Sequence, residues 1–205
     1  MEKIKNFLYY EWKKILAVIC VLVLVLVTVK QCNDKVVTDL GMLYISGVRT
    51  ENLPRLQEEI EKAGIAADID SDKKVTVKVR EILIPKSEEL KLEQQVPQQI
   101  QFEIISGENL LFITDKQTAV NNAMELSFAD ITEVAREYKI PEDKCLKYPD
   151  GKIFAISLEG NKLLEDMGIY NEGMYISQRN YTDKAKDELQ NINARKAMEY
   201  ILERK

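Results

Sequence analysis

Histidine is absent from the 205 residues of this chain. Histidine is the commonest general base near neutral pH, and it is also a regular member of catalytic triads and a frequent ligand of transition metals. Its absence therefore excludes most sites of these kinds, and no paired-carboxylate motif takes their place. We expect a protein that is not an enzyme and that carries no metal ion or other cofactor.

Cysteine, glycine and basic patches are also scarce. The three cysteines are Cys20, Cys32 and Cys145, too few and too scattered for a disulfide scaffold, although a bridge between Cys32 and Cys145 stays open. The eight glycines occur singly, which excludes a glycine-rich phosphate loop. The net charge is −5, and the sequence has no basic patch. This balance argues against a nucleic-acid partner.

The most distinctive stretch is Ile15–Val29, which contains no charged residue. As a helix it would be roughly 22 Å long, and aromatic and lysine flanks extend the segment to about residue 31. We therefore predict a transmembrane anchor that places the chain in contact with membrane lipid. A cleaved signal peptide is the main alternative, but the small residues that cleavage needs are missing. A buried core helix is the other alternative.

The distribution of lysine predicts the orientation of the anchor. Four lysines precede the apolar run and two follow it closely: Lys3, Lys5, Lys13, Lys14, Lys30 and Lys35. Positive charge stays on the cytoplasmic side, so the N-terminus is expected inside the cell membrane and the C-terminal domain outside. The expected organisation is a basic lead over 1–14, a transmembrane anchor over 15–31, a stalk over 32–41 and an α/β domain over 42–205.

Beyond the stalk, apolar strands alternate with amphipathic helices. Leu110–Thr114 and Lys152–Leu158 are continuous apolar runs, typical of strands that are covered on both faces. The chain ends in a long helix that starts at Thr182, with Ala185, Leu189, Ile192 and Ile201 predicted on its inner face. Together these patterns predict an α/β fold with a mostly parallel sheet flanked by helices.

One aspartate-rich turn has partial metal-loop character. Asp68, Asp70 and Asp72 have the 1-3-5 spacing of a calcium loop, but Lys73 and Val79 stand where that loop needs glycine and glutamate. We therefore interpret it as a charged turn.

Polar residues follow two of the predicted buried strands. Asp115 and Lys116 come after one strand, and Glu159 and Asn161 come after another. In open α/β sheets, ligands bind beyond the carboxyl ends of the strands. These four residues are therefore the candidate ligand or partner site. The alternative is that they only cap helices and end strands.

Several short motifs occur in an order that resembles a known family. They are the Asp115 strand end, Phe128-Ala129-Asp130-Ile131-Thr132, Tyr148-Pro149-Asp150-Gly151-Lys152-Ile153-Phe154-Ala155-Ile156-Ser157-Leu158 and Leu163-Leu164-Glu165-Asp166-Met167-Gly168-Ile169. The series resembles the first lobe of extracellular solute-binding proteins of the sugar-transport class, which implies a periplasmic-binding-protein-like lobe. The lead Tyr9–Lys13 is also similar to that of small membrane-anchored proteins of Gram-positive bacteria.

The chain departs from the family in one respect that bears on function. The resemblance covers residues 42–176, and only about 30 residues follow, which leaves no room for a second lobe. Half a clamp cannot bury most of a sugar. We therefore expect a non-catalytic, membrane-anchored extracytoplasmic domain that binds a protein partner or a small ligand. The alternative is a solute receptor whose cleft is completed by homodimerisation, and a hydrolytic enzyme is a third reading.

Overall fold

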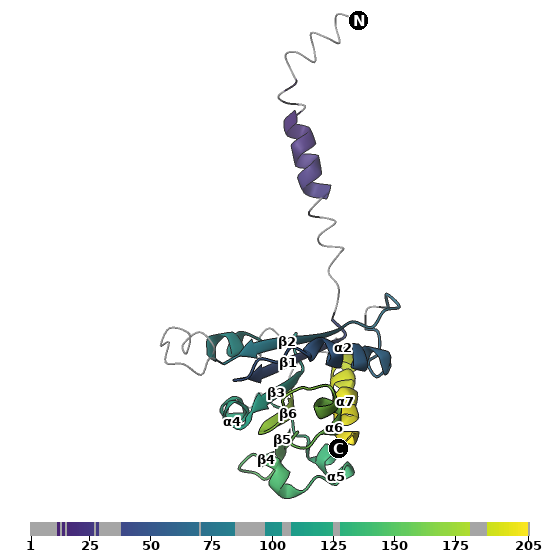
Figure 1. Ribbon diagram of the computed structural model, residues 1–205. Helices are drawn as coiled ribbons and strands as arrows, with labels where there is room; N and C mark the ends of the chain where they lie inside the picture. Colours follow the sequence, from purple (N-terminus) through teal and green to yellow (C-terminus); the bar gives the residue numbers. More distant parts are fainter. Residues whose placement is uncertain are drawn as a thin grey trace, which may run out of the picture. The chain divides into compact units, whose positions relative to one another are not determined.

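The computed structural model describes residues 12, 14, 16–26, 28, 38–69, 71–84, 97–103, 108–124, 128–180 and 188–204. The chain divides into two units, Met1–Val36 and Val37–Lys205. In the first unit, residues 16–26 form a helix whose large apolar side chains are 51% to 66% exposed (Figure 1). No helix in the described part of the chain is both long and apolar enough to cross a bilayer. The transmembrane helix expected over 15–31 is therefore not found there, and most of the expected stalk lies outside the described residues.

The second unit is built on a sheet of six strands in the order β2-β1-β3-β6-β5-β4. Strand β1 pairs in parallel with both β2 and β3, whereas β6 is antiparallel to β3 and β5, and β4 is antiparallel to β5. The strands are β1 (Leu40–Ser46), β2 (Val77–Leu83), β3 (Leu111–Asp115), β4 (Cys145–Lys147), β5 (Ile153–Ser157) and β6 (Met174–Gln178).

The α/β class is confirmed, but the prediction of a mostly parallel sheet is wrong. The sheet is mixed, because β6 runs antiparallel between β3 and β5, and β4 adds an antiparallel edge. The apolar runs in β3 and β5 reflect burial on both faces, and burial of this kind does not depend on strand direction. Strand β4 has only three residues, none of them buried, so its sequence carried no strand pattern.

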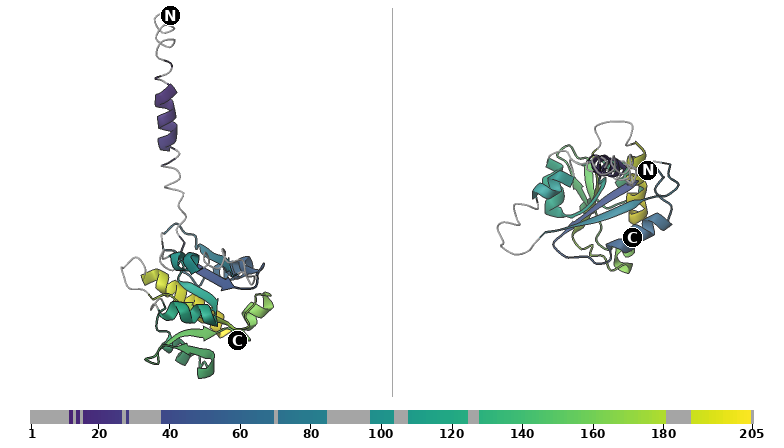
Figure 2. Two further views of the ribbon diagram at one scale, coloured as in Figure 1. Left: turned by 90° about the vertical axis from the view of Figure 1, so that its left-hand side faces the viewer. Right: turned by 90° about the horizontal axis from the view of Figure 1, so that it is seen from above.

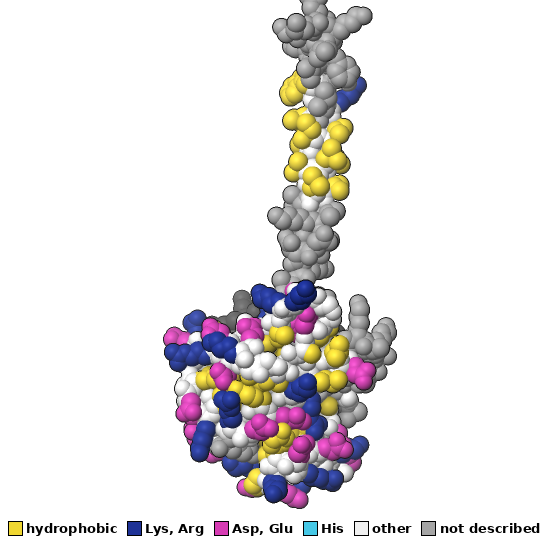
Figure 3. All heavy atoms as spheres, turned by 90° about the vertical axis from the view of Figure 1, so that its right-hand side faces the viewer, with side chains coloured by type: hydrophobic (Ala, Val, Ile, Leu, Met, Phe, Trp, Pro, Cys, Tyr) yellow, Lys and Arg dark blue, Asp and Glu magenta, His cyan; other side chains and the backbone are white. Residues whose placement is uncertain are grey.

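Helices cover both faces of the sheet unequally (Figures 1 and 2). One face packs against α2 (Leu53–Lys62), α5 (Thr132–Glu137), α6 (Lys162–Asp166) and α7 (Glu188–Glu203). The opposite face packs against α4 (Lys116–Met124) and against Ile100 of helical residues 97–103. A short 3-10 turn, η1 (Glu142–Lys144), precedes β4. Over the four-helix face, acidic and basic side chains are interspersed, with no large area of one sign (Figure 3). Among the described residues, fewer helices therefore cover the face that packs against α4 than the opposite face.

The inner face of α7 differs in part from the prediction. Ile201 is buried as predicted, but Leu189 and Ile192 are exposed, and Asn193 is fully buried. Ala185 lies outside the described residues. The Asn193 side chain accepts a hydrogen bond from the Ala67 N–H at 2.8 Å and donates to the carbonyl oxygens of Ala67 and Asp39 at 2.9 and 3.1 Å. Buried backbone groups require partners, so a polar residue faces inward here. A prediction of the inner face from apolar residues alone therefore misses Asn193.

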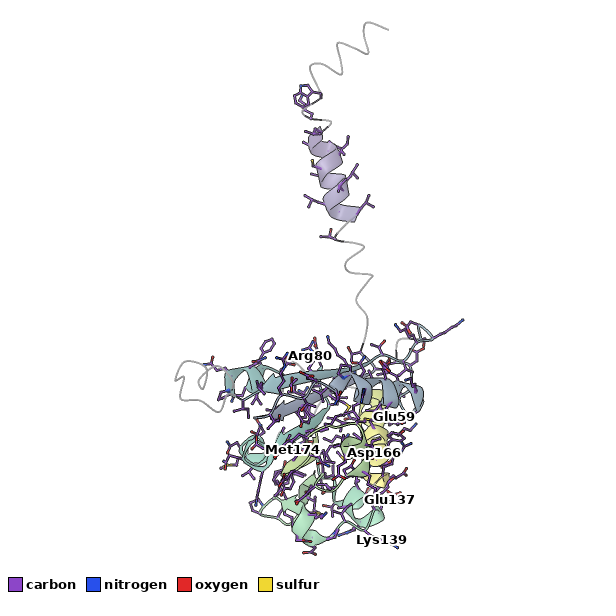
Figure 4. All side chains as sticks on the ribbon, viewed as in Figure 1. Glu59, Arg80, Glu137, Lys139, Asp166 and Met174 are labelled. Carbon is purple, nitrogen blue, oxygen red and sulfur yellow. The ribbon has the colours of Figure 1, made fainter. Side chains whose placement is uncertain are left out.

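Side chains of α2 cover part of the outer edge of β2. Glu61 accepts a hydrogen bond from the Val77 N–H at 3.2 Å, and Gln57 accepts one from the Val79 N–H at 3.5 Å. On the opposite side of α2, Glu59 accepts a hydrogen bond from Tyr200 of α7 at 2.7 Å (Figure 4). Helix α2 therefore joins the edge of the sheet to the last helix.

A close backbone approach occurs at Gly41 in β1. A Cβ atom on this residue would overlap the carbonyl oxygen of Glu108 and would lie 2.9 Å from its carbonyl carbon. The Leu110 N–H donates to the Gly41 carbonyl oxygen at 2.9 Å, and Arg80 of β2 binds Glu108 at 3.0 Å (Figure 4). The segment that leads into β3 is thus held directly against β1.

Candidate functional site

The predicted pair after β3 lies at the start of α4. The Asp115 carboxylate accepts hydrogen bonds from the Thr118 N–H at 3.0 Å and from the Thr118 hydroxyl at 2.7 Å. These contacts satisfy donors of the first turn of α4, as a capping carboxylate does. Lys116 is the first residue of α4, and its side chain is exposed.

The predicted pair after β5 divides between surface and interior. Glu159 is exposed, and its carbonyl oxygen accepts a hydrogen bond from the Lys144 ammonium at 3.2 Å. Asn161 is buried and caps α6, because its side chain accepts from the Leu164 N–H at 3.2 Å. Its amide also donates to the Ile201 carbonyl oxygen at 2.6 Å. Asn161 therefore joins α6 to α7.

The four predicted site residues follow strands that end at the same edge of the sheet, but they do not form a cluster. Asp115 pairs with Met174 of β6, and the Leu158 N–H donates to the carbonyl oxygen of Met174 on its other side (Figure 4). The ends of β3 and β5 are thus separated by β6, two strand spacings or roughly 10 Å apart. Asp115 and Glu159 share that edge, but Asn161 points into the core.

The aspartate-rich turn uses its carboxylates internally. Both oxygens of Asp68 accept backbone hydrogen bonds at 2.7 Å, one from Ser71 and one from Lys73. Asp72 likewise accepts from the Lys74 N–H. Asp70 lies outside the described residues. The described carboxylates shape the turn.

A pocket of about 590 Å³ lies at the opposite end of the parallel strands, between the end of α4 and the hairpin formed by β4 and β5. Its walls are mostly apolar, and Met124 at its rim is 81% exposed. Asp115 lies before the first residue of α4, whereas the pocket is lined by Met124 at the last residue of α4 and by Phe154 near the start of β5. The lining residues are Val120, Ala123, Met124, Leu146, Lys147, Tyr148, Pro149 and Phe154.

An irregularity in the hairpin positions the inner wall of this pocket. Leu146 pairs with Ala155 and Lys147 pairs with Ile153, so that Phe154 is an extra residue in the ladder. A bulge of this kind redirects a side chain. Phe154 accordingly packs on the α4 face, with its ring centroid 4.7 Å from Tyr148 and 6.5 Å from Phe128.

A second, more polar hollow of about 440 Å³ adjoins the first. It is lined by Phe128, Asp130, Tyr148, Pro149, Asp150, Lys152 and Asn180. Tyr148 and Pro149 line both hollows. The Tyr148 hydroxyl donates to the Phe128 carbonyl oxygen at 2.8 Å, and this hydrogen bond fixes the ring between the two hollows.

In the polar hollow, the pKa shifts keep the phenol of Tyr148 neutral and the carboxylate of Asp150 charged near pH 7. Burial raises the pKa of Tyr148, and the negative charges of Asp150 and Asp130 raise it further, so the phenol stays neutral near pH 7. Hydrogen bonds from the backbone N–H and the ammonium group of Lys152 lower the pKa of Asp150. Asp130 accepts a hydrogen bond from the Thr132 N–H at 2.9 Å. The arrangement is suited to holding and orienting a bound group.

Sequence reasoning did not find these two hollows. The pocket depends on the unpredicted strand β4 and on the bulge at Phe154. The only signal in the sequence is that aromatic residues occur at 128, 148 and 154, and aromatic residues are as typical of a core as of a site.

Neither a protein-family model nor a curated protein matches this chain. Among solved structures, the chain is similar to an ABC substrate-binding protein from Listeria monocytogenes in complex with cycloalternan, with 18% identity and a TM-score of 0.37. It is also similar to an N-glycan transport solute-binding protein from Streptococcus pneumoniae (18%, TM-score 0.36) and to the bacterial solute receptor AcbH, described as preferring β-D-galactopyranose (11%, TM-score 0.35).

These similarities are partial in both directions. They cover 57%, 65% and 64% of this chain but only 28%, 30% and 33% of the three solved chains, respectively. The chain thus corresponds to a third or less of each of these proteins. All three are described as substrate-binding or solute-binding proteins or as a solute receptor.

Proposed function

We propose that this protein is a non-catalytic binding module, held at the cell membrane by its N-terminal segment, that receives the apolar group of a small ligand between α4 and β4. The observation that carries this proposal is the pocket of about 590 Å³ with mainly apolar walls. Sites for small ligands typically have volumes of about 300 to 1,000 Å³, apolar walls and a few placed polar groups. The adjoining hollow supplies such polar groups.

A binding role, as opposed to a catalytic one, is supported by how the polar side chains are used. Tyr148 is a neutral phenol whose proton is donated to a backbone carbonyl oxygen. Asp130 and Asp150 each accept a backbone hydrogen bond. These contacts hold each group in place and leave it suited to contacting a ligand.

The membrane part of the proposal is supported by the surface of the first helix. The described apolar side chains of residues 16–26 are more than half exposed, and the run from Ile15 to Val29 has no charge. A continuous exposed apolar surface is unfavourable in water and marks a contact with lipid or protein. With four lysines before this run, we place the N-terminus inside the cell and the domain outside.

The pocket can be tested with a neutral probe, 2-phenylethanol. In full-length protein labelled with 4-fluorophenylalanine, we expect the ¹⁹F resonance of Phe154 to shift during a titration with this probe. The variant Met124→Glu should weaken binding about fivefold, because a carboxylate at the rim of the pocket loses hydration when an apolar group enters. The measurement is the dissociation constant from the Phe154 shift in ¹⁹F NMR.

Leu189→Glu is the matched control for Met124→Glu. It introduces the same carboxylate at an exposed apolar position of α7, outside the lining of the pocket, and should leave the dissociation constant unchanged. A Phe154 resonance that does not respond to the probe would contradict the proposed site, as would equal weakening by both variants.

A second candidate function is a solute receptor whose cleft is completed by a second copy of the chain. The observation that favours it is that Asp115 and Glu159 lie at one edge of the sheet, on either side of β6. If this reading holds, sedimentation equilibrium of the full-length protein should give a dimer, and a sugar such as D-galactose should raise its melting temperature. A monomer with an unchanged melting temperature would remove this candidate.

A further inference from the structure

We propose that the ligand of the proposed site is a small amphipathic amine: its apolar group fills the pocket between α4 and β4, and its ammonium group occupies the polar hollow beside Tyr148. This inference rests on the proposed function and specifies the chemistry of the ligand. It follows from the two lining residues that the hollows share and from the charges around the second hollow.

The two hollows adjoin at the hairpin turn, where Tyr148 and Pro149 line both. A small molecule that lies across these two residues would contact both environments. The apolar pocket presents Val120, Ala123 and Phe154. The polar hollow presents two carboxylates, an ammonium group and an amide, from Asp130, Asp150, Lys152 and Asn180. A ligand that fits both must therefore have an apolar end and a polar end.

The charges around the polar hollow determine which charge the polar end of the ligand should carry. Asp130 and Asp150 contribute two negative charges, and Lys152 contributes one positive charge, which leaves a net charge of −1. Lys152 is already paired with Asp150 at 3.2 Å. No ion pair with Asp130 occurs among the described residues. An incoming ammonium group can therefore pair with Asp130 without displacing another cation, whereas a carboxylate would be repelled.

The tyrosine ring adds a second attraction for a cation. Tyr148 is neutral and is held in place by its hydrogen bond to Phe128. A cation within about 6 Å of the face of such a ring is attracted by the ring electrons. A neutral or anionic head group gains nothing comparable. The expected order of affinity is amine, then alcohol, then carboxylate.

Three probes that share a phenyl group test this order: 2-phenylethylamine, 2-phenylethanol and 3-phenylpropionate. Each is titrated into full-length protein labelled with 4-fluorophenylalanine, and binding is followed at the Phe154 ¹⁹F resonance. We expect the dissociation constant of the amine to be about fivefold lower than that of the alcohol, the upper end of the range for an exposed ion pair. The carboxylate should bind more weakly than the alcohol.

Asp130→Asn tests the assigned contact directly. Asparagine keeps an oxygen that can accept the hydrogen bond from Thr132, so the variant removes the charge with little change in shape. It should raise the dissociation constant of the amine most of the way towards that of the alcohol, with only the attraction to the Tyr148 ring left, and it should leave the alcohol unaffected. Asp143→Asn is the matched control, because it removes an exposed charge of η1 that does not line the hollow.

The outcomes separate this inference from the proposed function. If amine and alcohol shift the Phe154 resonance with equal dissociation constants, the amine assignment is overturned and the apolar pocket stands. The same conclusion follows if Asp130→Asn leaves the preference for the amine intact. If none of the three probes moves the resonance, both the inference and the proposed function fail.

Discussion

A chain that carries Leu22→Lys together with Leu24→Lys should be lost from the membrane fraction of the cell, whereas the unchanged chain should resist extraction with alkaline carbonate. Both leucines lie in the exposed apolar helix of residues 16–26. A lysine in the centre of a membrane-inserted helix costs about 3 kcal/mol, so two of them should lower membrane insertion by roughly four orders of magnitude. The measurement is the distribution of the protein between soluble and carbonate-resistant fractions.

The matched control replaces Leu189 and Ile192 of α7 by lysine. These residues are also exposed and apolar, and the substitution adds the same charge to the second unit. It should leave the membrane fraction unchanged. The proposal of a membrane anchor would be wrong if the unchanged chain were soluble, or if the double lysine variant of the helix stayed in the carbonate-resistant fraction.

Gly41→Ala should destabilise the second unit by more than about 3 kcal/mol, at or above the upper end for overpacking of a core. The added methyl group would overlap the backbone of Glu108, which cannot rotate away as a side chain would. Relief of the overlap requires separating β1 from the segment that leads into β3, with loss of the hydrogen bond between Leu110 and Gly41. Chemical denaturation, followed by far-UV circular dichroism, measures the change in the free energy of unfolding.

Gly64→Ala separates steric overlap from backbone strain. Gly64 has a φ of 62°, and a Cβ atom there would meet no heavy atom within 4 Å. The cost should be only about 1 kcal/mol, from the left-handed conformation alone. Equal effects of the two substitutions would show that the approach of Glu108 to β1 is not as close as described.

The fold class was predictable because burial leaves a direct mark on the sequence. The apolar runs that became β3 and β5 are buried at almost every position. Strand direction leaves no such mark, since a residue of β6 is equally buried whichever way the strand runs. The antiparallel order of half of the sheet was therefore missed.

The candidate site was predictable only in part. Of the four polar residues predicted after strands, Asp115 and Asn161 cap helices, which is the alternative that the sequence left open. The two hollows depend on tertiary features, namely a bulge at Phe154 and a three-residue strand, β4. Neither feature has a local pattern, because a bulge is defined by its partner strand and not by its own residues.

The contacts of Gln57 and Glu61 with the edge of β2 have a consequence for assembly. An uncovered strand edge is a template for fibril growth, since each added chain hydrogen-bonds to the last. Here two outward N–H groups of the edge are already occupied by α2. At the far end of the sheet, β4 offers only three residues, among them a charged lysine. Neither border of the sheet is therefore a ready start for polymerisation.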